Sequence, residues 1–112
     1  MSFFEHLLAD TAAERADFAA IPQIRDGLQG RISRETYVAY LAQAYHHVRH
    51  TVPLMQVTKG QLSDDHARYR TALDDYIAEE TGHEQWILND IRAAGGDPEE
   101  TVRNGPAARM SF

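Results

Sequence analysis

The segment EETGHE, residues 79–84, gathers the side chains of this chain that are best suited to metal or acid–base chemistry. Glu80 and His83 are three residues apart, a spacing that places both side chains on one face of a helix. A Glu-x-x-His pair is the ligand set that helical bundles contribute to carboxylate-bridged iron and manganese sites. Carboxylate oxygen and imidazole nitrogen suit Fe(II), with Mn(II) as the alternative. Glu80 and His83 are therefore the predicted metal ligands.

The surrounding pattern strengthens this interpretation. One helix is predicted from Ser63 to Ala94, and Glu80 falls in the middle of its apolar stripe, with His83 and Glu84 within roughly 60° on either side. Moving a carboxylate out of water costs several kcal/mol unless a partner compensates, and a divalent cation would compensate both acids at once. Glu84 is the predicted third carboxylate or catalytic base. The alternative is a narrower apolar face that leaves both acids at a solvated edge, with His83 paired to Glu79.

A second cluster of candidate residues lies in the sequence YHHVRH, residues 45–50. We expect these residues on a helix that runs from Ser33 to Lys59 and kinks at Pro53, which cannot donate a backbone hydrogen bond to Arg49. The helix has two faces able to pack, and the histidines lie largely off its apolar stripe. They are candidates for orienting a substrate or for further ligation, with His47 as a catalytic candidate. The alternative is a solvated histidine face or a hydrogen bond at the core edge.

Three long helices are predicted to position these residues. They cover 3–18, 33–59 and 63–94, and a short fourth helix starts at Asp97 and Pro98 after the glycine pair that ends the third. Residues 21–33 contain Pro22, Gly27 and Gly30 and read as a connector with room for one helical turn. No alternating strand pattern is present. The predicted class is all-α, a helical bundle formed by one domain over residues 1–112.

Composition excludes several classes of function. The 112 residues carry a net charge of −6 and form no basic stripe, so a nucleic-acid partner is not expected. The chain has no cysteine, which excludes disulfides, thiolate metal sites and a cysteine nucleophile. No apolar run is long enough to span a membrane, and the first residues lack a basic leader. We expect a cytoplasmic protein.

The segments GRISRETYVAYLAQAYHHVRHTVPLM and DYIAEETGHEQWILNDIRAAGGDPE together resemble the amino-terminal half of the heme-oxygenase-like superfamily, which includes TenA- and PqqC-type proteins. The closest resemblance is to its iron-containing redox enzymes, the heme-oxygenase-like diiron oxidases and oxygenases. The resemblance covers about Phe3 to Glu100, and its most specific part is the EExGHExW segment. The TenA thiaminase branch fits poorly because its nucleophile is a cysteine.

The resemblance implies a seven-helix bundle around one cavity, in which one or two Fe(II) ions use dioxygen on fatty acids, amino acids or related small molecules. Glu80 and His83 match the first ligand pair, and the predicted cavity and substrate residues are Tyr45, His46, His50, Tyr76 and Glu79. No heme is expected, because the only candidate proximal ligand on the first helix, His6, sits too near the terminus. The remaining ligands of the family come from helices beyond residue 112, so either further chain or a homo-oligomer must complete the site.

Three functions remain open on these grounds. The first is a non-haem iron oxidase or oxygenase with a small-molecule substrate. The second is a helical assembly or small-molecule-binding module without chemistry, in which the polar stripe is a buried hydrogen-bond network. The third is a cofactor-free oxidase of the PqqC type.

Overall fold

The computed structural model describes residues 1–107, and all the regular secondary structure in that range is helical, which confirms the all-α class. The chain divides into two compact units, Met1–Ser33 and Arg34–Phe112. The prediction of a single domain stays a prediction. Among the described helices, none combines the length and apolar character needed to cross a membrane.

The first unit contains three short helices, α1 (Phe3–Asp10), α2 (Ala12–Ala20) and α3 (Pro22–Leu28). The single helix predicted over 3–18 is therefore wrong. It is interrupted at Thr11, whose hydroxyl donates to the Leu7 carbonyl at 2.7 Å. The predicted connector is also wrong in part, because α3 starts at Pro22, where the missing N–H costs nothing. None of the three helices contains a buried residue.

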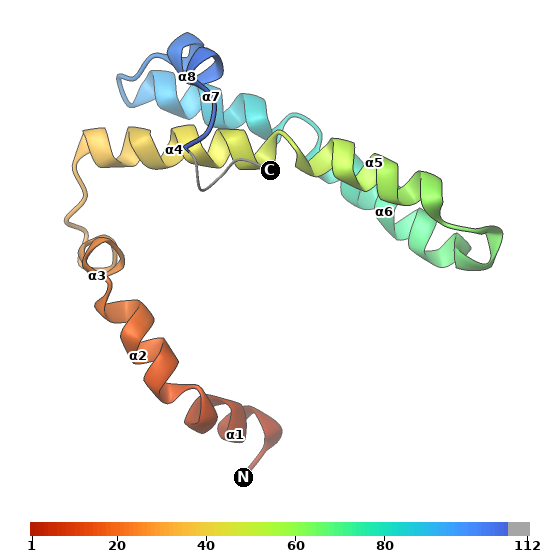
Figure 1. The fold of residues 1–112 in the computed structure, drawn as a ribbon, viewed down its shortest axis with the longest axis horizontal. Coiled ribbons are helices and arrows are strands. Elements are labelled where there is room, and N and C mark those ends of the chain that lie inside the picture. The colour runs from red at the N-terminus through yellow and green to blue at the C-terminus, as the bar shows by residue number, and fades with distance from the viewer. Residues whose placement is uncertain (108–112) are drawn as a thin grey trace. The chain divides into compact units, whose positions relative to one another are not determined.

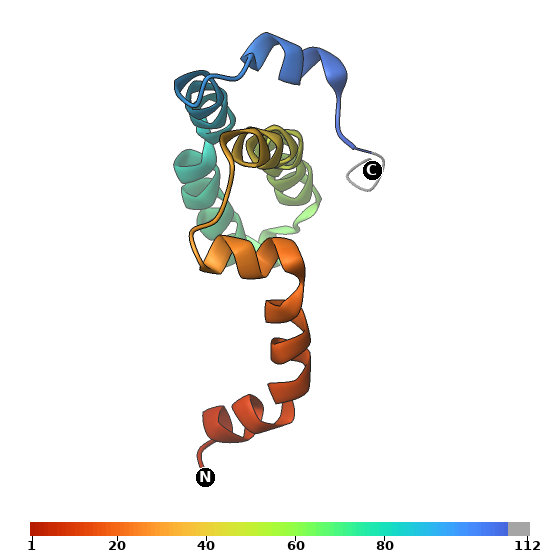
Figure 2. The same cartoon turned by 90° about the vertical axis from the view of Figure 1, so that its left-hand side faces the viewer.

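The second unit is a long hairpin of helices (Figure 1). Its elements are α4 (Arg34–Val48), α5 (Thr51–Gln61), the short 3₁₀ helix η1 (Asp64–His66), α6 (Ala67–Glu80), α7 (His83–Ala93) and α8 (Pro98–Asn104). The chain runs out along α4 and α5 and returns along α6 and α7, so that α4 packs against α7 and α5 against α6. Helix α8 then contacts both α4 and α7, as Figure 2 shows from the side.

Each of the two predicted long helices of this unit is broken near its middle. The first break lies at Arg49–His50, and α5 begins at Thr51, which places Pro53 in the first turn of the new helix. Proline is tolerated in the first turn because the amide it lacks would have no partner there. The predicted kink is thus a complete break, and it lies at the end of the histidine cluster, at Arg49–His50.

The second break lies at Thr81–Gly82. Thr81 has an extended backbone and its hydroxyl donates to the Ile77 carbonyl at 2.6 Å, while Gly82 has a φ of +92°. Glycine adopts this left-handed conformation without steric cost, which is why it commonly ends helices. Gly82 therefore ends α6 and, as the cap residue of α7, redirects the chain between Glu80 and His83.

The core of the second unit lies between α4 and α7. Leu41 and Tyr45 of α4 and Ile91 of α7 are buried there, and Ile91 is fully buried. Close helix approach depends on Gly96, where an added Cβ would lie 2.8 Å from Val38 Cγ1 and 2.9 Å from Ile91 Cγ2. The glycine pair that was predicted to end this helix therefore also sets the packing of α4 against α7.

Replacing Gly96 with alanine should destabilise the fold, because the methyl group would overlap the Val38 and Ile91 side chains. Overpacking of this kind costs about 1–3 kcal/mol. The matched control is Gly60→Ala, since nothing lies within 4 Å of a Cβ there and Gly60 lies within α5. The control should stabilise by about 0.5 kcal/mol. Urea unfolding measures both, and equal effects of the two substitutions would contradict this account of the packing.

The attachment of α8 should weaken at acid pH. Asp97 caps α8 by accepting hydrogen bonds from the Glu99 and Glu100 amides at 3.0 and 3.3 Å. Hydrogen bonding with Glu99 and with the Glu100 backbone lowers the pKa of Asp97 below its ordinary value of 3.8. A lowered folded-state pKa stabilises the fold above the unfolded-state pKa, and this contribution is lost as pH falls through the folded-state pKa.

Amide chemical shifts of α8, followed by NMR from pH 6 down to pH 2, measure this loss. The Asp97→Asn variant keeps an acceptor at the cap but has no carboxyl to titrate, so its α8 shifts should not show the transition. An identical transition in the variant would assign the effect to another group.

Candidate metal centre

Glu80 and His83 meet across the turn that joins α6 to α7. Glu80 is the last residue of α6 and His83 is the first residue of α7. His83 Nδ1 lies 3.1 Å from Glu80 Oε2, and the two side chains are 30% and 25% exposed. The sequence correctly predicted that these residues face each other. The reason was wrong, because the glycine turn and not continuous helical spacing brings them together.

The His83 ring is covered on one side by Trp86. Their ring centroids are 4.4 Å apart with an interplanar angle of 33°. Trp86 itself is 63% exposed, so the indole shields the imidazole at the surface of the unit. On the other side of the turn, nothing lies within 4 Å of where a Gly82 Cβ would be. The pair is therefore half-buried, stacked on one face and approachable beside Gly82.

The hydrogen bond determines which donor atoms remain for a metal ion. Because Nδ1 of His83 is engaged by Glu80, Nε2 is the ring nitrogen left to bind a cation. Histidines that ligate metals commonly direct their other ring nitrogen to a carboxylate, which fixes the ring orientation and raises ligand basicity. Imidazole nitrogen and carboxylate oxygen are donors that suit iron. The pair fits a metal centre in which His83 is a ligand and Glu80 is the carboxylate that orients it.

The other residues predicted around this pair occupy different environments. Glu84 is half-buried, whereas Glu79 and Tyr76 are exposed. The alternative pairing of His83 with Glu79 is wrong, because the partner of His83 is Glu80. Over residues 1–107 no group of three or more histidine, aspartate or glutamate side chains is close enough to hold a metal ion. The described chain thus offers a pair of donors at this turn, without Glu84 as a third.

The histidine-rich end of α4 lies close to the α6–α7 turn, in the part of the hairpin that we call the joint. In Figure 1 the break between α4 and α5 lies beside the break between α6 and α7. Tyr45 and His46 are buried here and pack edge-to-face with ring centroids 5.1 Å apart, while His47 is exposed and His50 is half-buried. The two predicted clusters, far apart in the sequence, therefore gather at one joint.

His46 has an unusual environment for a polar side chain. It is only 1% exposed, and its Nδ1 has no hydrogen-bond partner. A buried polar atom without a partner costs about 1–3 kcal/mol, so natural proteins retain such atoms for a reason. Sequence reasoning predicted a cavity role for His46 but gave no reason to expect an unsatisfied nitrogen.

Sequence reasoning missed a pocket of about 470 Å³ between α4 and α8, in whose wall His46 lies. Glu35 and Gln43 of α4 and Glu100 and Asn104 of α8 also contribute to its lining. The signal that could have revealed it is the Gly95-Gly96 pair followed by Asp97-Pro98, which reverses the chain and starts a new helix. The sequence does not show which helices α8 packs against, so the pocket could not be predicted.

Comparison with known proteins gives one match. Residues 38–111, more than half of the chain, match a family model described as an iron-containing redox enzyme. No curated protein and no solved structure matches. The matched range includes both breaks of the hairpin and the Glu80–His83 pair. The chain therefore belongs to the family of iron-containing redox enzymes of the heme-oxygenase-like superfamily, of which it covers a part.

Proposed function

We propose that this chain contributes to a non-haem iron centre, with one or two Fe(II) ions, that oxidises a small organic substrate with dioxygen. The observation that carries the proposal is the 3.1 Å contact between Glu80 Oε2 and His83 Nδ1 at a half-buried turn. It is supported by the family to which the chain belongs, whose description names iron and redox chemistry.

The residues around the turn have distinct roles in this proposal. Glu80 would accept a hydrogen bond from His83 Nδ1 and hold the ring so that Nε2 could bind iron. Trp86 covers one face of the ring, which limits the access of water to the ligand. Iron held there would supply the one-electron chemistry with dioxygen that no amino-acid side chain provides. Glu84, a half-buried residue in the first turn of α7, would move a proton to or from the substrate.

The substrate would lie at the joint of the hairpin, between the α4 end and the α6–α7 turn. Tyr45 and His50 would form one wall, with Tyr76 and Glu79 on the opposite helix and His47 available for proton transfer. His46 lies in the wall of the α4–α8 pocket instead. These assignments rest on the adjacency of the two breaks in Figure 1. The polarity of this wall favours a substrate with a polar head group.

One imidazole ligand is too few for an iron centre, so further protein must complete it. Dinuclear centres in helical bundles use two Glu-x-x-His pairs together with two more carboxylates. A second copy of this chain would supply the second pair, which supports a homo-oligomer as the working form.

Substitution at the pair should abolish iron retention. His83→Gln removes the imidazole ligand, and Glu80→Gln removes the carboxylate that orients it, which should weaken Fe(II) binding by about 10–100-fold. The control is Glu79→Gln, which makes the same charge change one residue away at an exposed side chain. Iron content of protein loaded anaerobically with Fe(II) and desalted measures the effect. Equal iron in all four proteins would refute the proposed centre.

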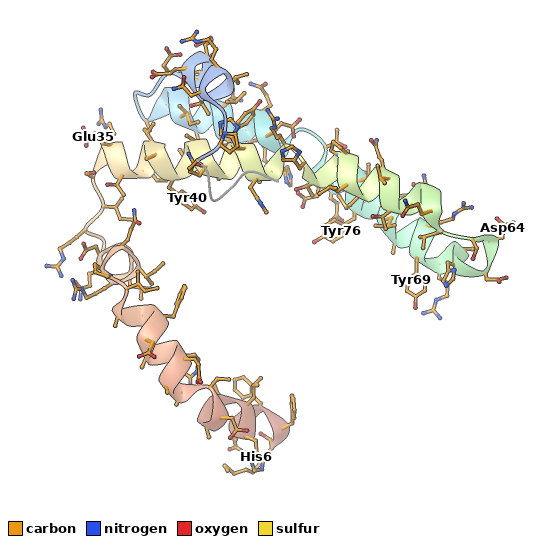
Figure 3. All side chains as sticks on the ribbon, in the orientation of Figure 1. His6, Glu35, Tyr40, Asp64, Tyr69 and Tyr76 are labelled. Atoms are coloured by element: carbon orange, nitrogen blue, oxygen red, sulfur yellow. The ribbon has the colours of Figure 1, made fainter. Side chains whose placement is uncertain are left out.

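A second candidate function is assembly without chemistry, and the exposed aromatic side chains of the second unit favour it. Tyr40, Tyr69 and Tyr76 are 66%, 64% and 55% exposed. All three project to the same side of the helical hairpin in Figure 3. Exposed aromatic residues that share a face are typical of protein interfaces.

Light scattering with and without a strong chelator separates the two functions. If iron joins the copies through Glu80 and His83, the chelator should convert the oligomer to monomer, because each copy loses its link to the other. An oligomer that persists unchanged in the chelator, and also in the Glu80→Gln variant, would favour the assembly module.

A further inference from the structure

Trp86 is placed against the predicted iron ligand and not in the core of the hairpin. It follows His83 by three residues on α7, and residues at this spacing are neighbours on a helix. The centroids of the two rings are 4.4 Å apart, with an interplanar angle of 33°. The indole is nevertheless 63% exposed, whereas Ile91 of the same helix is fully buried. Burial in the core therefore does not account for this tryptophan, whereas its stack on His83 does.

The His83 ring is restrained by two contacts that oppose different motions. Its Nδ1 lies 3.1 Å from Glu80 Oε2, a contact at a single atom of the ring edge. The outer torsion of a histidine side chain has a broad energy minimum, so a ring held at one atom can still tilt. The indole lies against the face of the imidazole and opposes this tilt. Glu80 and Trp86 together therefore determine both the direction and the plane of the ring.

The plane of an imidazole matters for metal binding because the nitrogen lone pair lies in it. A ring that is free to tilt loses this freedom when it binds a metal ion, and ordering a side chain on binding weakens the affinity. An imidazole bound to a cation is also poorer in electrons, and the electron-rich face of an indole is favourable beside it. The stack on Trp86 therefore favours the metal-bound form of His83 in two ways.

We infer that Trp86 is a positioning residue for His83, and that its indole fixes the plane of the imidazole whose edge Glu80 holds. The inference rests on the proposed iron centre, and it gives Trp86 no contact with the iron or with the substrate. The alternative is that the two rings are neighbours only because of helical spacing, in which case removing the indole would leave the His83 ring unchanged.

The order of the His83 ring in the metal-free full chain tests the inference first. Carbon-13 relaxation of the ring C–H groups gives an order parameter, which should fall below about 0.6 in Trp86→Leu, the range of flexible groups. Trp86→Phe keeps an aromatic face and should restore most of the order. The backbone order parameters of α7 should be the same in all three proteins, which separates ring positioning from a loss of the helix.

Fe(II) affinity, measured without oxygen by competition with a chelator, tests the consequence for the metal. Trp86→Leu should weaken binding by about 2–10-fold, the effect of ordering one side chain on binding, and Trp86→Phe should recover most of it. Tyr37→Leu is the matched control. It removes an exposed aromatic ring from the first turns of α4, which lie near the far end of α7 because Arg34 contacts Gly95. The control should bind iron like the unmodified chain.

The fluorescence of Trp86 reports on the same site without a label, because it is the only tryptophan among the 112 residues. Fe(II) bound to His83 should quench this fluorescence with a saturable dependence on iron concentration. The saturable quenching should disappear in His83→Gln. Saturable iron binding that leaves the fluorescence unchanged would place the metal away from Trp86 and overturn the inference.

The measurements separate the inference from the proposed function. An unchanged order of the His83 ring in Trp86→Leu overturns the inference even if iron binds to His83. Equal iron affinity of Trp86→Leu and the unmodified chain, despite a mobile ring, overturns it as well. If the unmodified chain retains no iron, the proposed centre is refuted, and the ring measurement alone then supports or overturns the positioning of His83 by Trp86.

Discussion

The hydrogen bond between Glu80 and His83 is the interaction on which the functional account depends. It joins the end of one helix to the start of the next, at a turn that only a glycine accommodates without strain. Because the imidazole is held by one of its nitrogens, its remaining nitrogen has a fixed direction. A metal site requires this kind of preorganisation, since each ligand that is ordered beforehand reduces the entropy lost on binding.

The two breaks in the hairpin give this interaction its surroundings. At the first break, Pro53 prevents α4 from continuing through α5, and at the second, Thr81 and Gly82 separate α6 from α7. The two breaks lie side by side (Figure 1). The helical backbone is therefore interrupted in both arms of the hairpin at the same distance along it. Continuous helices would have filled this level with packed side chains. At the two breaks the side chains are polar instead. The apolar core, with Leu41 and Ile91, lies further along α4 and α7.

Much of this architecture could be predicted from the sequence. The helical class, the cap at Asp97 and the glycine pair after α7 follow from local signals that act within a few residues. The closeness of Glu80 and His83 was predicted from helical spacing, but it is the turn at Gly82 that brings the two side chains together. The helix breaks were not predicted at their positions. Thr81 is compatible with a helix. Whether Gly82 continues the helix or ends it depends on what α6 and α7 contact.

The α4–α8 pocket shows the limit of such reasoning more clearly. Glu35 and Glu100 are 65 positions apart, and neither belongs to a recognisable motif. Their proximity to one pocket follows from the close approach of Gly96 to Val38 and Ile91, which directs α8 back over α4. Helical periodicity placed His46 off the apolar stripe of its own helix, yet its side chain is 1% exposed and lies in the wall of the pocket that α8 helps to form.

The central claim is that His83, held by Glu80, is a ligand to iron. X-ray absorption spectroscopy of the Fe(II)-loaded full chain tests it most directly, because imidazole carbons beyond the first coordination sphere give a recognisable scattering pattern. The account predicts this pattern in the unmodified protein and its weakening or loss in His83→Gln. An iron spectrum that is identical in the two proteins would show that the metal binds elsewhere and would contradict the account.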